Sequence, residues 1–175
     1  KITSQKLRLF VPGESDAIIQ VTYISPSGVF APIGLDSLRI PAQKVVEVDL
    51  AGLPKSRLFS VGVRASEPIV GSVLTRGTFD NRSELAWSTS TNVSTGERIT
   101  LPEKSGWLSI ITDAPKVSFT VVGVRGKKST VTLKVDSMAV WKVPDSARAI
   151  QFAAGSAKLS LAFAIRNTSG LATTA

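Results

Sequence analysis

The chain has 175 residues, a formal net charge of +8 and 43% hydrophobic residues, with a mean hydropathy of +0.19. This hydrophobic content is sufficient for a packed core, which argues against a disordered chain. The chain has no cysteine and no histidine, which excludes disulfides, thiol nucleophiles, zinc sites built on these residues and proton transfer by an imidazole.

The composition favours strands over helices. Val, Ile and Thr together account for 46 residues, and their branched side chains fit a pleated sheet better than a helical turn. No long stretch has apolar residues spaced three and four apart, so an amphipathic helix has little support. A helical turn competes only at Leu85–Trp87 and Ala147–Ala157.

Six short strands are predicted in the first half of the chain. In chain order they are Lys6–Val11, Ile18–Ser25, Leu38–Ile40, Val45–Leu50, Leu58–Ala65 and Ile69–Arg76. Proline and glycine separate them, because proline cannot donate to a ladder and glycine accepts a positive φ. Alternation such as Val61/Val63 predicts one buried and one solvated face. Short strands at this spacing are typical of a small immunoglobulin-like β-sandwich.

The second half repeats the order of the first, with an offset that drifts between 90 and 101 residues. The matched segments are Leu7–Leu9 with Leu108–Ile110, Val21–Gly28 with Phe119–Gly126, Leu38–Val48 with Leu133–Val143, and Ser56–Arg76 with Ser146–Arg166. Because internal repeats decide an architecture, we predict an all-β chain built from two tandem immunoglobulin-like β-sandwich units.

The boundary between the two units is placed near residue 100, within a Ser- and Thr-rich stretch over residues 77–105. The first unit, with its junction, then covers residues 1–100 and the second covers residues 101–175. Leu85 and Trp87 are too apolar for a simple tether. We expect them, together with Trp107, to be packed where the units meet.

Three features resemble an actinobacterial family of secreted or membrane-anchored β-sandwich repeat proteins of unknown function. They are the start Leu7–Pro12 followed by Val21–Ile24 and Gly28, the series Leu38–Ala42, Val45–Leu50 and Val61–Val70, and Glu84–Trp87. The resemblance implies an extracytoplasmic location and a membrane anchor upstream of Lys1. It brings no catalytic residues to this chain.

The densest positive cluster is Arg125, Lys127 and Lys128, in a predicted hairpin turn. The second half carries 10 basic and 4 acidic residues, which favours an anionic partner. Backbone N–H groups beside three cations suit a phosphate or carboxylate, so these three residues are candidate ligand-binding residues. The alternative is a solvated hairpin tip. Nucleic acid is disfavoured, because no aromatic side chain is interleaved with the cluster to stack on bases.

Trp141 is the fourth candidate ligand-binding residue. In the repeat it takes the place of Val46, between Val140 and Val143, and we expect it to face outward, where an indole ring can stack on a sugar. The alternative is that Trp141, like the other two tryptophans, packs in a core or an interface.

No catalytic residue, metal site or cofactor is predicted. Acid–base catalysis needs carboxylates that converge in a cleft, whereas Glu47 and Asp49 share one face of a predicted strand. Asp80–Glu84 lacks the spacing of a calcium loop and is interpreted as a polar turn.

The predicted function is therefore a non-enzymatic, extracytoplasmic structural or interaction module of a bacterial cell-envelope protein. The alternative is a binder of cell-wall glycan or anionic polymer. The expected partner is an envelope protein or a cell-wall polymer, with membrane attachment only through the upstream anchor.

Overall fold

The computed structural model describes residues 2–50, 59–79, 81–89, 98–101, 106–153, 158–167 and 170–174, with the backbone alone for residues 79, 165–167 and 170–174. Within these ranges the chain forms sixteen strands and one 3-10 turn, without an α-helix. No helix in the described part is long and apolar enough to cross a membrane. The strands form four antiparallel sheets, which confirms the all-β prediction.

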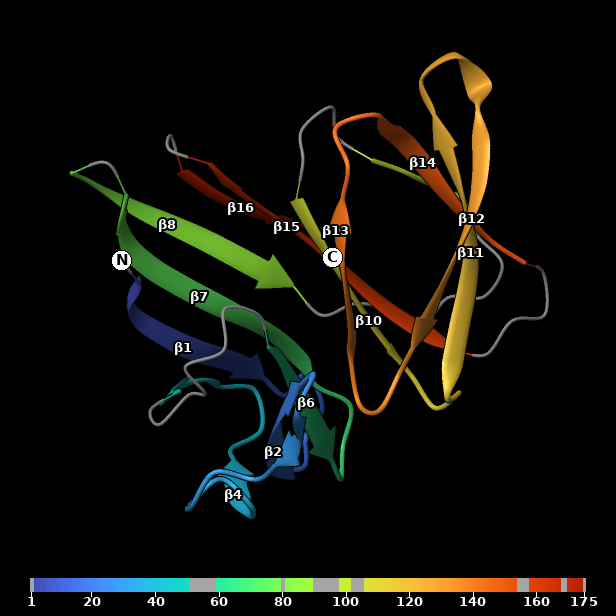
Figure 1. The fold of residues 1–175 in the computed structure, drawn as a ribbon. Helices are drawn as coiled ribbons and strands as arrows, with labels where there is room; N and C mark the ends of the chain where they lie inside the picture. Colours follow the sequence, from blue (N-terminus) through green and yellow to red (C-terminus); the bar gives the residue numbers. More distant parts are fainter. Residues whose placement is uncertain are drawn as a thin grey trace.

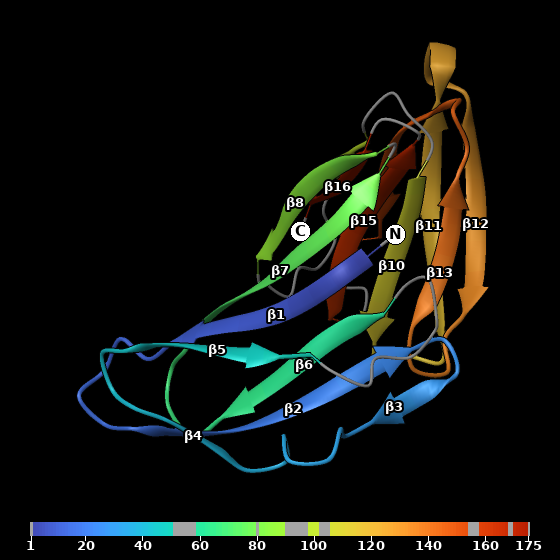
Figure 2. The same cartoon turned by 90° about the vertical axis from the view of Figure 1, so that its left-hand side faces the viewer.

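Sheets A and B are built from the first half of the chain. Sheet A has the order β5 (Val45–Asp49), β1 (Ile2–Phe10), β7 (Val70–Phe79) and β8 (Arg82–Thr89). In sheet B, the central β2 (Ala17–Ser25) pairs along one edge with β6 (Ser60–Ala65) and along the other with β3 (Gly28–Phe30) and β4 (Leu38–Ile40). Figure 2 shows β1 of sheet A lying above β2 and β6 of sheet B.

Sheets C and D are built from the second half. Sheet C has the order β13 (Ala139–Val143), β10 (Gly106–Thr112), β15 (Leu159–Asn167) and β16 (Gly170–Thr174). Sheet D has the order β12 (Lys128–Lys134), β11 (Lys116–Gly123), β14 (Ala147–Phe152) and β9 (Arg98–Thr100). The 3-10 turn η1 (Val124–Gly126) joins β11 to β12.

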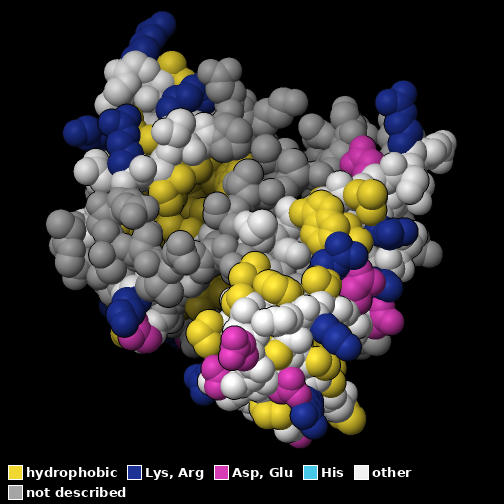
Figure 3. All heavy atoms as spheres, turned by 180° about the vertical axis from the view of Figure 1, so that it is seen from behind, with side chains coloured by type: hydrophobic (Ala, Val, Ile, Leu, Met, Phe, Trp, Pro, Cys, Tyr) yellow, Lys and Arg dark blue, Asp and Glu magenta, His cyan; other side chains and the backbone are white. Residues whose placement is uncertain are grey.

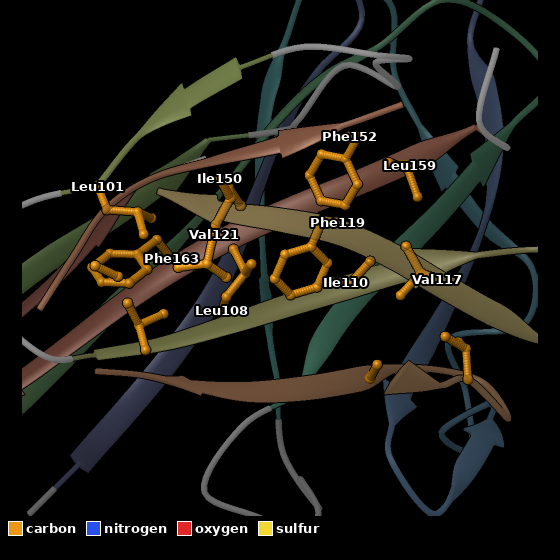
Figure 4. Packing of buried hydrophobic residues seen from close by; sticks show 14 residues of the cluster. Leu101, Leu108, Ile110, Val117, Phe119, Val121, Ile150, Phe152, Leu159 and Phe163 are labelled. Atoms are coloured by element: carbon orange, nitrogen blue, oxygen red, sulfur yellow. The ribbon is translucent and has the colours of Figure 1, made fainter. Parts of the chain in front are cut away.

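Two separate clusters of buried side chains fill these pairs of sheets. The cluster of sheets A and B contains Leu7, Leu9, Val11, Ala17, Ile19, Val21, Tyr23, Ile40, Val48 and Leu50. That of sheets C and D contains Leu101, Leu108, Ile110, Val117, Phe119, Val121, Val135, Ala139, Val143, Ala147, Ile150, Phe152, Leu159 and Phe163. Figure 4 shows Phe119 beside Phe152 within the second cluster, where their ring centroids are 5.4 Å apart. Each half of the chain thus has its own core.

Described residues of the two pairs of sheets contact each other between β8 and β16 and at the loop between β12 and β13. The edge strands β8 and β16 lie side by side (Figure 1). The loop between β12 and β13 reaches sheet B, where the Ser137 hydroxyl donates to the Ser25 carbonyl at 2.5 Å. The Ser60 hydroxyl also donates to Sδ of Met138 at 3.6 Å. Met138 is 2% exposed and belongs to neither core, so it is buried where the two halves meet.

Each of the six strands predicted in the first half corresponds to a described strand to within a few residues, whereas β3 and β8 were not predicted. A helical turn was an alternative to a strand in two places. Both are extended, since Leu85–Trp87 belongs to β8 and residues 147–152 form β14. Residues 98–100, inside the predicted junction, form β9 and pair with β14. Apart from Asn81 and Leu101, the described parts of this junction are therefore strands of sheets A and D.

Candidate functional site

The basic cluster of Arg125, Lys127 and Lys128 lies at the tip of the β11–β12 hairpin. The turn needs two positive φ angles, 61° at Arg125 and 74° at Gly126, and glycine adopts the second at no steric cost. All three basic side chains are exposed. Figure 3 shows Lys and Arg side chains gathered at this end of the molecule.

The backbone of the hairpin tip is already hydrogen-bonded to the protein. The Gly123 N–H donates to the Lys127 carbonyl at 2.7 Å, and the Val124 N–H donates to the Ser146 carbonyl at 3.0 Å. These two N–H groups are therefore not available to an anion. A ligand at the tip would therefore be bound mainly by the three exposed basic side chains.

The hairpin continues into a polar, positively charged outer face of sheet D that was not predicted from the sequence. We call it the basic face, and it consists of Lys116, Ser118, Thr120, Arg125, Lys127, Lys128, Thr130, Thr132 and Lys134. Lys116 lies opposite Lys134 in the β11–β12 register, and the hydroxyls of Ser118 and Thr132 are 2.8 Å apart. Lys128 and Lys134 are six residues apart, or about 20 Å along a strand. Cations thus mark both ends of a strip of hydroxyl groups.

Trp141 faces the interior, so the prediction that it faces outward was wrong. It lies opposite Leu108 in the β10–β13 register. It is half-buried against the second core, with its ring centroid 5.1 Å from that of Phe119. Val46, with which it was matched, also packs against a core. Because side chains alternate along a strand, it is Val140 that points to the other face.

Leu85, Trp87 and Trp107 are not buried where the halves meet, which corrects a second expectation. Their exposed fractions are 59%, 44% and 38%. Trp87 lies on the outer face of sheet A, where the Arg8 guanidinium carbon is 5.1 Å from its ring centroid, a cation–π arrangement. Nε of Arg8 also donates to the Glu47 carboxylate at 2.9 Å. This patch of Leu85, Trp87 and Arg8, which we call the Trp87 patch, combines apolar surface with a fixed cation.

Glu47 and Asp49, which were considered for catalysis, form ion pairs at the surface, as does Asp16. Hydrogen bonds from Arg8 and then Lys6 lower the pKa of Glu47. A hydrogen bond from the Ala42 N–H, followed by one from Arg39, lowers the pKa of Asp16. A general acid at neutral pH needs a raised pKa instead, so these groups are held as ionised surface charges.

A cation site has no geometric basis in the described ranges. No group of three or more acidic side chains lies close enough together there to hold a metal ion. Of the predicted polar turn at Asp80–Glu84, Asp80 lies outside the described residues, and Asn81 adopts a left-handed φ of 61° between β7 and β8.

Comparison with known proteins places the chain in a family. A family model described as "Family of unknown function (DUF5719)" matches residues 1–144. No curated protein and no solved structure matches the chain. The resemblance to a family of unknown function is thereby confirmed at that level. Because the model matches most of its length, the chain belongs to the DUF5719 family.

Proposed function

We propose that the chain is a non-enzymatic, extracytoplasmic interaction module of an actinobacterial cell-envelope protein, and that it is built from two tandem immunoglobulin-like units. The strand orders support the two units, since β5-β1-β7-β8 corresponds to β13-β10-β15-β16. The central β2, between β6 and β3/β4, likewise corresponds to β11 between β14 and β12. The location and the source rest on the resemblance of Leu7–Pro12 and the segments that follow it.

The observation that carries the interaction role is the Trp87 patch. Leu85 and Trp87 stand exposed on β8, and Arg8 is fixed over the indole ring by Glu47. Trp and Arg are the residues most enriched among those that dominate protein–protein binding energy. Side chains that are already held in place lose little freedom on binding, which favours affinity. The patch therefore suits a partner protein.

The interaction role is tested by affinity purification from cross-linked membranes of cells that express the intact protein. We expect one envelope protein to co-purify with the parent chain and to be lost with Leu85→Ser/Trp87→Ser. Trp107→Ser, which changes a similarly exposed tryptophan on sheet C, is the matched control and should retain the partner. Equal recovery from all three chains, or no partner at all, contradicts the proposal. Digestion of the chain by protease added to intact cells tests the location.

The second candidate function, binding of an anionic cell-wall polymer, is favoured by the basic face. Its cations are spread over about 20 Å of strand, with hydroxyl groups between them, which suits a polymer of repeating anionic units. Of the cations on the basic face, Lys134 alone has an ion-pair partner among the described residues, Asp136 at 3.4 Å.

Binding to purified anionic wall polymer, measured over a range of salt concentrations, tests this second function. Lys127→Glu/Lys128→Glu should weaken binding and reduce its dependence on salt, because fewer cations then neutralise the polymer. Lys44→Glu changes an exposed lysine in the first half of the chain and should alter binding much less. Unchanged binding in the double variant contradicts a role for the hairpin tip.

A further inference from the structure

The outer edge of β14 in sheet D is covered by β9, a strand of only three residues. Ile99 lies opposite Ile150, and the Leu101 N–H donates to the Arg148 carbonyl at 2.8 Å. Ile99 packs against the second core, and Leu101 is 3% exposed. With this cover, the core-facing residues Ile150 and Phe152 of β14 are buried to 0% and 2% exposure. β9 therefore both pairs the edge and closes the core.

β6 has the corresponding place in sheet B but lacks such a cover within the described residues. Like β14, it runs antiparallel to the central strand of its sheet and precedes a strand of the other sheet. Its core-facing residues, Val61 and Val63, pack against the first core but remain half-buried. Among the described strands, β6 pairs with β2 alone.

We call the edge of β6 that no described strand covers the open edge. The pairing of β2 with β6 determines which backbone groups point to it. The Ser66 N–H donates to the Ile18 carbonyl at 3.0 Å. Since hydrogen-bonded and non-hydrogen-bonded pairs alternate in an antiparallel ladder, residues 62 and 64 also direct their N–H and C=O groups to β2. Val61, Val63 and Ala65 direct theirs away from it. In β14 the carbonyl of Arg148 likewise points away from the central strand, toward β9.

The residues around the open edge define what kind of segment fits it. β9 supplies the pattern, with Ile99 on the core side between Arg98 and Thr100 on the outer side. Arg64 is exposed on the outer side of β6 and forms no ion pair with a described residue. Opposite charges on neighbouring strands attract, so an acidic residue on the incoming strand is favoured. A second copy of β6 is disfavoured, because it would bring two Arg64 side chains onto one face of a short ladder.

We infer that the open edge of β6 binds an extended segment of the partner protein as an added antiparallel strand, with an apolar residue over Val63 and an acidic residue beside Arg64. Strand addition of this kind obtains affinity from main-chain hydrogen bonds and specificity from alternate side chains. The inference rests on the proposed interaction role and deepens it, since it names the edge that is used and the chemistry of the bound segment.

The test uses the intact chain and two fluorescein-labelled peptides, with binding followed by fluorescence anisotropy. Peptide E has the sequence Gly-Glu-Glu-Ile-Thr-Leu-Pro, which is residues 96–102 of this chain with R98E. Peptide R keeps the arginine. We expect saturable binding of peptide E and weaker binding of peptide R. Arg64→Glu should reverse this order, and this reversal cannot come from unfolding, because an unfolded chain would lose both peptides.

Val63→Pro gives a second, independent measurement at the same edge. The Val63 N–H points to the open edge, so proline there removes a donor to the added strand and leaves the β2–β6 ladder intact. We expect binding of peptide E to fall by about tenfold. Val63→Ala, which keeps the N–H, is the matched control and should bind more tightly than Val63→Pro. Far-UV circular dichroism verifies that both variants are folded.

Several outcomes separate this inference from the proposed function. Absence of saturable binding, or binding that is unchanged by both Arg64→Glu and Val63→Pro, overturns the strand-acceptor inference. A partner that depends on Trp87 but co-purifies equally with Val63→Pro also overturns it and leaves the interaction role standing. If the chain binds peptide E as described but no envelope partner is recovered, the edge is supported and the proposed function fails.

Discussion

Replacing Phe119 by leucine perturbs the centre of the second core without adding a polar group. Phe119 is 2% exposed, and its ring centroid lies 5.1 Å from that of Trp141 and 5.4 Å from that of Phe152. Leucine keeps the site apolar but removes both ring contacts and leaves part of the space unfilled. The matched control is Phe30→Leu, because Phe30 is 39% exposed and forms one ring contact, with Tyr23 at 5.6 Å.

The contacts of the two phenylalanines give different expected losses of stability. An aromatic pair contributes roughly 0.5–1.5 kcal/mol beyond its buried area, and a change of shape in a close-packed core costs up to about 1.5 kcal/mol more. We therefore expect Phe119→Leu to lower the free energy of unfolding by about 2–3 kcal/mol. Phe30→Leu, with a single pair at a partly exposed site, should lower it by less than about 1 kcal/mol.

Urea unfolding, followed by tryptophan fluorescence and far-UV circular dichroism, measures both losses by linear extrapolation. Phe119→Leu should also change the native emission of Trp141, whose neighbour it removes, while Phe30→Leu should leave the emission unaltered. Equal losses of stability at the two positions would refute the packing described for Phe119. So would an unaltered emission in Phe119→Leu, because it would mean that Trp141 does not contact this ring.

Gly106→Ala should lower the stability by about 1–3 kcal/mol in thermal unfolding, because an added Cβ would lie 2.5 Å from a ring carbon of Phe163. Gly13→Ala, where no atom lies within 4 Å of that position, should have no such cost, and equal effects would contradict the close contact. Hydrogen bonds lower the pKa of Glu47 in the folded protein. They therefore stabilise the fold at a pH above the unfolded pKa of about 4.3, and this stabilisation is lost as the pH falls through the lower pKa of the folded state. Acid unfolding monitored by circular dichroism should accordingly be less steep in Glu47→Gln than in the parent, and identical curves would contradict the ion pairs. Ile99→Ala should lower the free energy of unfolding by about 1–2 kcal/mol and speed amide hydrogen exchange along the outer edge of β14. Unchanged protection there would contradict the covering role of β9.

The class of the fold and most strand positions could be predicted because their signals are local. Proline and glycine between short runs of β-formers delimit strands such as β2, in which buried residues from Ala17 to Tyr23 alternate with exposed or half-buried ones. The three-residue strands β3 and β9 are too short to show a period and were missed. β8 was missed for another reason, since its apolar residues Leu85 and Trp87 lie on an exposed face.

The faces of individual strands were harder to predict, because an error of one residue turns every side chain over. The match of Ser56–Arg76 with Ser146–Arg166 aligns core-facing residues of β7 with core-facing residues of β15, since Val73 falls on Phe163 and both contact a core. With the same offset, however, core-packed Val61 falls on exposed Gln151. The connections that follow β6 and β14, residues 66–69 and 153–158, differ in length, which a constant offset does not capture.

The basic face could not be predicted because strand pairing assembles it from separate segments. Lys116 and Lys134 are far apart in the sequence, yet they lie opposite each other in the hairpin. The sequence alone indicated only the part of the basic face whose cations are close together in the chain, namely Arg125, Lys127 and Lys128. Trp141 was misplaced for a related reason, since its orientation depends on the register of β13 against β10.

The position of β1 in the middle of sheet A has a consequence for how the chain is made. Leu7 pairs with Val48 on one side and Val73 on the other, so β1 is synthesised before both of its partner strands and has to wait for them. At a synthesis rate of about 5–20 residues per second, its two edges stay unpaired for several seconds, and long-range pairing is slow in itself. β10 repeats this situation between β13 and β15. Aggregation competes with folding during that interval, and the arrival of β7 and then β15 ends it.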